Sequence, residues 1–382
     1  MTPRADAGGR EAPIPRRPYT RDVDPLQFIR DDWDSLEPYH PVKPLDVLAD
    51  EIGVPVSQLV KLDANENLYG AHDAVREAIG RADLHIYPDP GQGRLRAAIA
   101  EYVGVTAEQV VAGQGADDLI DIILRLVRPA AIIDSVPTFA MYGFLAKING
   151  ARVIAIPRSS GFEVDVAATV VAIEANPGAI VFLTSPNNPT GNRVRDEELS
   201  ELLATGALVV VDEAYIEFSG GTHTRLLDAN PNLILLRTFS KWAALAGLRV
   251  GYALCHAALA ERMMAIKQPY NVNIAAEAAA IAALEHRGEI LETVRMLAAE
   301  RERMTTLLAG FGWLRAHPSE ANFVLFDVEG RNAGAVADGL RRQGVLVRYY
   351  NRPLLENCIR ISAGRPEDTD RLVEALKTLE VS

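Results

Sequence analysis

Short apolar runs alternate with helical patterns through the middle of the chain, and this alternation constrains the fold more than any other feature. The runs span residues 109–112, 130–133, 152–156, 179–184, 207–211 and 233–236. Each run is bounded by turn or charged residues, as strands that are buried on both faces usually are. Strands that alternate with helices favour an α/β domain with a mostly parallel sheet, sandwiched by helices.

The pattern changes near residue 273. Residues 273–308 are rich in Ala, Glu, Leu and Arg and carry no strand signal, so one or two long helices are expected there. Strand patterns at 322–328, 345–349 and 357–362 then precede a final helical pattern at 366–379. Such a mixture predicts a second, smaller α+β domain.

These patterns predict three parts of the chain. Residues 1–35 are expected to be a flexible leader, and residues 66–272 a large domain. Residues 36–65 are expected to join residues 273–382 in the small domain.

Composition argues against several classes of function. The 382 residues are 48% hydrophobic and 24% charged, with a net charge of −12. This acidic balance disfavours electrostatic binding to nucleic acid or to a membrane surface, although a local basic pocket for a phosphorylated small molecule remains compatible. The two cysteines, Cys255 and Cys358, lie far apart. They predict neither a disulfide framework nor a metal site, and a reducing compartment fits them.

The N-terminal residues predict a cytoplasmic protein. Residues 1–17 mix Arg, Pro, Gly and acids and lack the apolar stretch of a secretory signal. No stretch of about 20 apolar residues suggests a membrane span. An organelle transit peptide is the alternative, since arginines are present, but acids are interspersed and serine is absent.

Three polar strings follow expected strands. The first is Ser185 to Gly191 (SPNNPTG), the second is Asp212 to Tyr215 (DEAY), and the third is Arg237 to Lys241 (RTFSK), with Arg249 eight residues after the lysine. Each alone has an ordinary explanation: a plain turn, an aspartate that caps a helix, or a solvated lysine. Together they place an Asp, a Tyr, a Lys, an Arg and an Asn at one edge of one sheet, where ligands of open α/β sheets gather.

The strings SPNNPTG, DEAY and SK…GLRVG, in this order, resemble the fold-type-I aminotransferases that use pyridoxal 5′-phosphate (PLP). The resemblance covers nearly the whole chain. It implies that Lys241 holds the cofactor as a Schiff base and carries the proton during transfer. It also implies that Asp212 faces the pyridine nitrogen and that Tyr215 and Asn188 bind the ring O3′.

The resemblance further implies a phosphate site and a stacking face. The residues expected at the PLP phosphate are Thr238, Ser240, Arg249, Gly115 and Ala116, the last two because a helix N-terminus binds anions. Asp117 matches a family residue beside the pyridine edge, and Phe139 one that stacks on the ring. Tyr69 matches a tyrosine donated to the phosphate of the neighbouring subunit, which implies a homodimer.

Within this family the chain is most similar to histidinol-phosphate aminotransferases. The similar strings are Glu37-Pro38-Tyr39, Lys61 to Asn67, Gly115 to Asp117, Asp212 to Phe218 and Leu355 to Ser362. The similarity implies a transaminase of histidine biosynthesis whose substrates are a phosphorylated amine and glutamate or 2-oxoglutarate. The residues expected around the substrate phosphate are Tyr39, Tyr142, Arg348 and Arg360, and Arg360 is also expected to bind the glutamate carboxylate.

The chain departs from the family pattern in two places. The family commonly has tyrosine at the position of Phe139 and VGT where this chain has Ala363-Gly364-Arg365. Relatives with near-identical strings also transaminate aromatic amino acids, so an aromatic amino-acid aminotransferase remains an alternative. A PLP-dependent threonine-phosphate decarboxylase, which shares the lysine and the fold, is another. A ligand-sensing domain of a transcription regulator is a third, disfavoured by the acidic charge and by the lack of a DNA-binding segment.

Overall fold

The computed structural model describes residues 24–36 and 43–380. The chain divides into two units, residues 1–38 and residues 39–382. In the first, the described part forms two 3-10 helices, η1 (Pro25–Phe28) and η2 (Trp33–Ser35). The predicted leader lies mostly outside the described residues, and its flexibility stays a prediction. The second unit holds both sheets.

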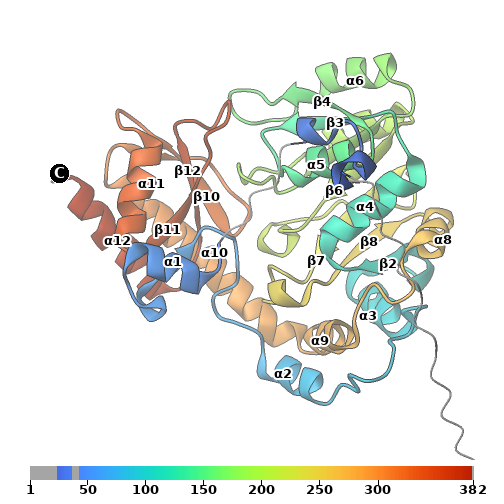
Figure 1. Cartoon of the computed structure of the whole chain (residues 1–382), viewed down its shortest axis with the longest axis horizontal. Coiled ribbons are helices and arrows are strands. Elements are labelled where there is room, and N and C mark those ends of the chain that lie inside the picture. The colour runs from blue at the N-terminus through green and yellow to red at the C-terminus, as the bar shows by residue number, and fades with distance from the viewer. Residues whose placement is uncertain (1–23, 37–42, 381–382) are drawn as a thin grey trace, which may run out of the picture. The chain divides into compact units, whose positions relative to one another are not determined.

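The large sheet of the second unit has seven strands among the described residues, in the order β2-β8-β7-β6-β5-β3-β4 (Figure 1). Their bounds are β2 Val110–Gly113, β3 Ala131–Val136, β4 Arg152–Pro157, β5 Ile180–Thr184, β6 Leu208–Asp212, β7 Leu233–Thr238 and β8 Gly251–Cys255. Strands β3 to β7 run parallel, and β8 is antiparallel to both β2 and β7.

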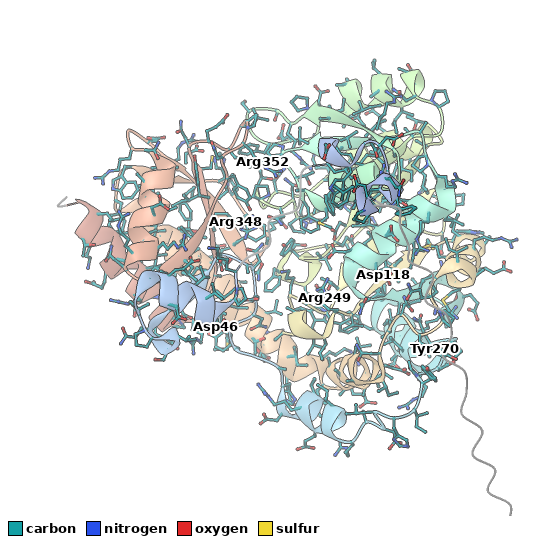
Figure 2. The ribbon with its side chains drawn as sticks, in the orientation of Figure 1. Asp46, Asp118, Arg249, Tyr270, Arg348 and Arg352 are labelled. Carbon is teal, nitrogen blue, oxygen red and sulfur yellow. The ribbon has the colours of Figure 1, made fainter. Side chains whose placement is uncertain are left out.

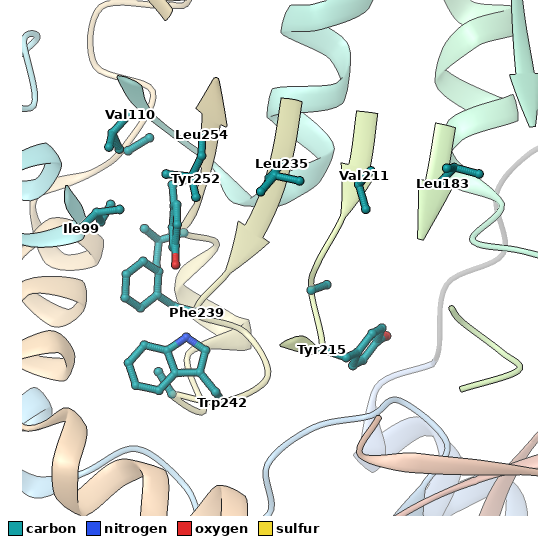
Figure 3. Packing of buried hydrophobic residues seen from close by; sticks show 14 of the residues in the cluster. Ile99, Val110, Leu183, Val211, Tyr215, Leu235, Phe239, Trp242, Tyr252 and Leu254 are labelled. Carbon is teal, nitrogen blue, oxygen red and sulfur yellow. The ribbon is translucent and has the colours of Figure 1, made fainter. Parts of the chain in front are cut away.

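Helices cover both faces of this sheet. One face packs on α4 (Gly115–Val127), α5 (Met141–Ile148) and α8 (Ala257–Ile266). The other packs on α3 (Gly93–Val103), α6 (Val166–Ala175), α7 (Asp196–Ala204) and α9 (Ile274–Glu285), and α9 also contacts α2 (Asp73–Gly80). Successive strand residues alternate between the two faces: Val210 joins the first core and Val211 the second. Figure 3 shows Leu183, Val211, Leu235 and Leu254 in the second core.

The small sheet has five described strands in the order β1-β11-β12-β10-β9. Their bounds are β1 Val60–Leu62, β9 Leu314–Ala316, β10 Phe323–Val328, β11 Val345–Tyr349 and β12 Cys358–Ser362. The accompanying helices are α1 (Leu45–Ile52), α10 (Arg287–Ala309), α11 (Ala333–Arg342) and α12 (Pro366–Glu380). Side chains from α10, α11, α12 and the strands share one buried core.

The predicted fold class is confirmed: a mostly parallel sheet lies between helices, and a smaller α+β part accompanies it. Three strands were not predicted. None of β1, β8 and β9 was singled out as a strand, and β1 and β9 have only three residues each. The domain boundaries stay a prediction, although β1 does pair with β11 of the small sheet. Within residues 24–36 and 43–380, no helix is both long and apolar enough to cross a membrane.

A buried ion pair holds the ends of β6 and β7 together. Glu213 has no exposed surface, and the Arg237 guanidinium donates to its carboxylate at 2.9 Å. The same guanidinium donates to the hydroxyls of Thr222 and Thr224, and the His223 amide donates to Glu213. Because Glu213 directly follows Asp212, this network fixes the loop that leaves the carboxyl edge of the sheet.

Breaking this pair should strongly destabilise the protein. Arg237→Met leaves a buried, uncompensated carboxylate, which should lower the free energy of unfolding by about 3–5 kcal/mol. The double variant Arg237→Met/Glu213→Gln should recover much of that loss. Lys377→Met, which breaks the exposed pair with Glu374, serves as the control and should cost less than about 1 kcal/mol. Equal losses for Arg237→Met and Lys377→Met in urea unfolding would contradict the buried pair's importance.

Candidate functional site

Asp212 ends β6 at the carboxyl edge of the large sheet. It lies opposite Thr184, the last residue of β5, and is 3% exposed. Its carboxylate accepts hydrogen bonds from the Tyr142 hydroxyl at 2.7 Å and from the Ala214 amide at 3.0 Å. Both donors are neutral, and burial raises the pKa of Asp212 to about 6. A buried carboxylate with neutral partners is a good acceptor for a cationic N–H group.

Tyr142 contacts Asp212 through its hydroxyl. It was predicted to contact the substrate phosphate, but its side chain is fully buried and its hydroxyl lies 2.8 Å from Thr184 while it donates to Asp212. Its ring stacks on Phe182, with centroids 5.1 Å apart. In this structure the Tyr142 hydroxyl therefore holds the Asp212 carboxylate, and the expected contact with the substrate phosphate stays a prediction.

Tyr215 follows β6 in the turn that Figure 3 shows beyond Val211. It is 5% exposed, and its hydroxyl accepts a hydrogen bond from the Asn65 side-chain amide at 3.0 Å. Its ring meets Phe323 of β10 edge-on. Burial raises the pKa of Tyr215 to about 12, so the hydroxyl keeps its proton near neutral pH and is available as a donor.

Lys241 lies just after β7, at the same edge. Its ammonium donates to the Ala64 carbonyl oxygen at 3.2 Å and lies 5.8 Å from the centre of the Tyr215 ring. Burial, and after it the charge of Arg360, lowers the pKa of Lys241 to about 8. A lysine with this pKa has a substantial fraction of neutral, nucleophilic amine near neutral pH.

Two arginines from the small sheet lie side by side. Arg348 of β11 and Arg360 of β12 are direct cross-strand partners, and both guanidinium groups lie within 6 Å of the Tyr350 ring centre. Arg360 is 5% exposed and donates to the Asn188 side chain at 2.6 Å and to the Asp63 carbonyl. Its Nε is buried without a hydrogen-bond partner among the described residues. Figure 2 shows Arg348 and the exposed Arg352.

The residues expected at the PLP phosphate also converge. The Thr238 hydroxyl donates to the Ser240 hydroxyl at 2.9 Å, and Arg249 (Figure 2) donates to Asp117 at 3.1 Å. Gly115 opens α4 with φ of +82°, and a side chain there would come within 2.6 Å of the Arg249 guanidinium. Glycine is therefore required where the helix start meets Arg249, and the amide groups of Ala116 and Asp117 lie in that first turn.

Three expected site residues remain: Phe139, Tyr69 and Tyr39. Phe139 is half-buried and meets Tyr142 edge-on, so its ring borders the Asp212 network. Tyr69 is partly buried, and burial, followed by the charge of Glu300, raises the pKa of its hydroxyl. Its expected contact with the phosphate of a neighbouring subunit stays a prediction. Tyr39 lies outside the described residues.

Asn65 is a site residue to which the sequence assigned no role. It has a left-handed backbone, with φ of 54°, which asparagine tolerates better than most residues. Its amide nitrogen donates to Ser362 and its carbonyl accepts from Asn322, both from the small-sheet part, while its side chain donates to Tyr215. The string that contains it carried the family resemblance, but only the fold reveals these partners.

The cluster fits PLP chemically. A cofactor of this kind offers a cationic ring nitrogen, an anionic ring oxygen, an aldehyde and a phosphate. The residues offer a buried carboxylate at Asp212, a protonated hydroxyl at Tyr215, an amine of lowered pKa at Lys241, and Arg249 beside the start of α4. Each chemical group of the cofactor therefore has a complementary group at this edge of the sheet.

Comparison with known sequences agrees with this chemistry. Residues 57–376 match the family model for class I and II aminotransferases. A histidinol-phosphate aminotransferase from Roseiflexus castenholzii is 46% identical over 361 residues, which cover 92% of this chain and 97% of the relative. A chloroplastic histidinol-phosphate aminotransferase from Arabidopsis thaliana is 45% identical over 356 residues, covering 92% of this chain and 85% of the relative.

Solved structures give the same result. The fold matches a histidinol-phosphate aminotransferase from Sinorhizobium meliloti, crystallised with PLP, with a TM-score of 0.80 and 29% identity over 89% of this chain and 96% of that one. The enzyme of the same name from Clostridium acetobutylicum matches with a TM-score of 0.79 and 26% identity over 84% of this chain and 99% of that one. The chain therefore belongs to the class I and II aminotransferases, with histidinol-phosphate aminotransferases among its relatives.

Proposed function

We propose that this chain is a PLP-dependent transaminase that exchanges an amino group between histidinol phosphate and 2-oxoglutarate, giving imidazole-acetol phosphate and glutamate. The relatives that are 43–46% identical over 92% of the chain carry the name of this activity. The observation in the structure that supports it best is the pair of arginines, Arg348 and Arg360, of which Arg360 acts electrostatically on Lys241.

The arginine pair supports an anionic substrate. Like charges directly opposite each other on neighbouring strands are destabilising unless a counter-charge lies between them. Arg348 and Arg360 are such a pair, and Arg360 keeps one buried donor without a partner. A phosphate or carboxylate can accept from both guanidinium groups at once. Two cations suit the doubly charged phosphate of the amine better than one cation would.

The position of Arg360 also connects the anion site to the reacting amine. Arg360 bonds to Asn188, and its charge lowers the pKa of Lys241. A substrate held by its anion at Arg360 therefore presents its amino group near Lys241. The same guanidinium would hold the carboxylate of glutamate in the other half of the reaction, so one site would serve both substrates.

Lys241 would supply the base. When bound, PLP acts as an electron sink that makes the substrate α-proton acidic. The neutral amine of Lys241 would remove that proton, and the resulting ammonium would return it at the other end of the shifted bond system. The Ala64 carbonyl, which accepts from the Lys241 ammonium in this structure, would hold the protonated side chain in place.

Asp212 and its neighbours would orient the ring. The Asp212 carboxylate would pair with the pyridine nitrogen and keep it protonated, and Tyr142 and the Ala214 amide would hold that carboxylate. Tyr215 and Asn188 would donate to the ring oxygen, and Phe139 would cover the ring face. Thr238, Ser240, Arg249 and the first turn of α4, including Gly115, Ala116 and Asp117, would hold the phosphate.

A homodimer would complete the site. Tyr69 would donate its hydroxyl to the cofactor phosphate of a neighbouring subunit, as the family resemblance implies. Tyr39 would add a hydroxyl at the substrate phosphate. Cytoplasmic location and the lack of nucleic-acid or membrane partners stay predictions from composition.

Comparison of substrates tests the proposal. The ratio kcat/KM should be highest for histidinol phosphate, ahead of phenylalanine, tyrosine and threonine phosphate. Arg348→Gln should lower kcat/KM for histidinol phosphate roughly ten- to a hundredfold, the loss expected for a charge-assisted contact, and should affect glutamate much less. Arg352→Gln, an exposed arginine on the same segment, is the matched control. Preference for phenylalanine, or carbon dioxide release from threonine phosphate, would establish an alternative instead.

Tyr142→Phe should leave the Asp212 carboxyl group in place but remove one of its hydrogen-bond donors. The Tyr142 hydrogen bond lowers the pKa of Asp212, against the larger effect of burial, so its loss should raise that pKa. Because the ionised carboxylate is the active form, the acidic limb of the kcat/KM profile should move to higher pH. The rate near pH 7 should fall roughly tenfold, as for the loss of about 1.5 kcal/mol. Tyr102→Phe, which removes a hydroxyl facing Glu217, should leave the profile unchanged. An unshifted limb in Tyr142→Phe would refute the support of Asp212 by Tyr142.

The lowered pKa of Lys241 can be measured directly. The rate of covalent PLP uptake by the cofactor-free protein should rise with pH and level off above about 8, since only the neutral amine reacts. Arg360→Gln removes a cation that lowers this pKa, so the midpoint should move to higher pH, whereas Arg352→Gln should not move it. A pH midpoint of about 10.4, the pKa of an ordinary lysine, would contradict the lowered pKa of Lys241. Borohydride reduction and peptide mapping would identify the modified lysine.

A further inference from the structure

Two imidazoles and a carboxylate meet on the surface away from Lys241. His72 immediately precedes α2, His286 lies between α9 and α10, and Glu289 is in the first turn of α10. The His72 Nε2 lies 3.0 Å from one oxygen of Glu289, and the His286 Nδ1 lies 3.5 Å from the other. One potential ligand atom from each of the three residues lies within 4.8 Å of the other two.

These distances suit a metal ion. A tetrahedral ion with bonds of about 2.0–2.1 Å separates its ligand atoms by roughly 3.3 Å, and the separations of 3.0 and 3.5 Å lie on either side of that value. Because they reach different oxygens of Glu289, the carboxylate would bind through both oxygens or turn to present one. Two imidazoles and one carboxylate are ligands that Zn²⁺ accepts, and imidazole also suits Ni²⁺ and Cu²⁺. The His72 and His286 rings are nearly parallel, 5.2 Å apart, which keeps both near the same carboxylate.

The local structure around His72 and His286 positions the two rings and also lowers the expected affinity for a metal ion. The His72 Nδ1 accepts a hydrogen bond of 3.3 Å from the Ala74 amide, so a metal at Nε2 would require the ring proton to move to Nδ1 and this long bond to be lost. His286 closes α9 and precedes α10, so the negative end of one helix offsets the positive end of the next. Because metal binding would break the bond from the Ala74 amide, we expect the affinity for a metal ion to be moderate.

We propose that His72, His286 and Glu289 form a binding site for one divalent transition-metal ion, Zn²⁺ being the best fit, with water completing the coordination. The ion would connect the segment that follows Tyr69 to the junction of α9 and α10. The site was not expected from the sequence, and it is independent of the proposed transaminase activity. Its ligands come from residues that the catalytic proposal does not use.

Calorimetric titration of the untagged holoenzyme with ZnCl₂ tests the site. The wild-type chain should bind one ion per chain with micromolar affinity. His72→Asn should weaken that binding at least about tenfold, because asparagine can cap α2 but cannot replace the imidazole ligand. Glu289→Gln and His286→Asn should do the same.

His256→Asn is the matched control. His256 caps α8 through a 3.3 Å bond from the Ala258 amide, as His72 caps α2, but it belongs to no cluster of metal-binding side chains among the described residues. It should bind Zn²⁺ as the wild type does. A rise of the thermal midpoint with Zn²⁺ should be seen in the wild type and His256→Asn and should be lost in the three site variants. Absence of saturable binding to the wild type, or equal binding by the site variants, would overturn the proposal.

Discussion

Burial of the large sheet on both faces is the constraint on which the rest of this structure depends. Because strands β5, β6 and β7 are apolar up to their carboxyl ends, the polar side chains of these three strands lie where the strands end. Thr184, Asp212 and Thr238 are those ends, and parallel pairing brings Thr184 and Asp212 opposite each other. The chemical site is thus a consequence of the way the core is covered.

The small sheet contributes a different kind of group. The large sheet supplies a buried carboxylate and an amine, whereas β11 and β12 supply the two cations, Arg348 and Arg360. The two contributions meet through Asn65, whose hydrogen bonds reach Ser362 and Asn322 on one side and Tyr215 on the other. A concentration of positive charge therefore exists locally in a chain whose net charge is −12.

Sequence patterns predicted the parts of this arrangement that depend on local order. Apolar runs located most strands of the large sheet, because a buried parallel strand is apolar along its length, and the polar strings after them contained Asp212 and Lys241. Long-range partners were less accessible. Strands β1 and β9 are too short for a periodic signal, and the place of Tyr142 depends on how α5 packs against β5 and β6. The metal-binding cluster is another example, since His72 and Glu289 are far apart in the chain.

Because the charge of Arg360 acts on Lys241, the pKa of Lys241 would depend on whether an anion is bound at Arg360. The guanidinium charge lowers the pKa of the lysine while no anion neutralises it. An anion bound at Arg360 reduces that effect by Coulomb's law, and the lysine becomes more basic as a result. Binding of a substrate by its phosphate or carboxylate would thus make the neutral amine of Lys241, the proposed base, intrinsically more basic, while lowering the fraction of Lys241 that is neutral at a given pH. The strongest base would then be present only when a substrate is in place.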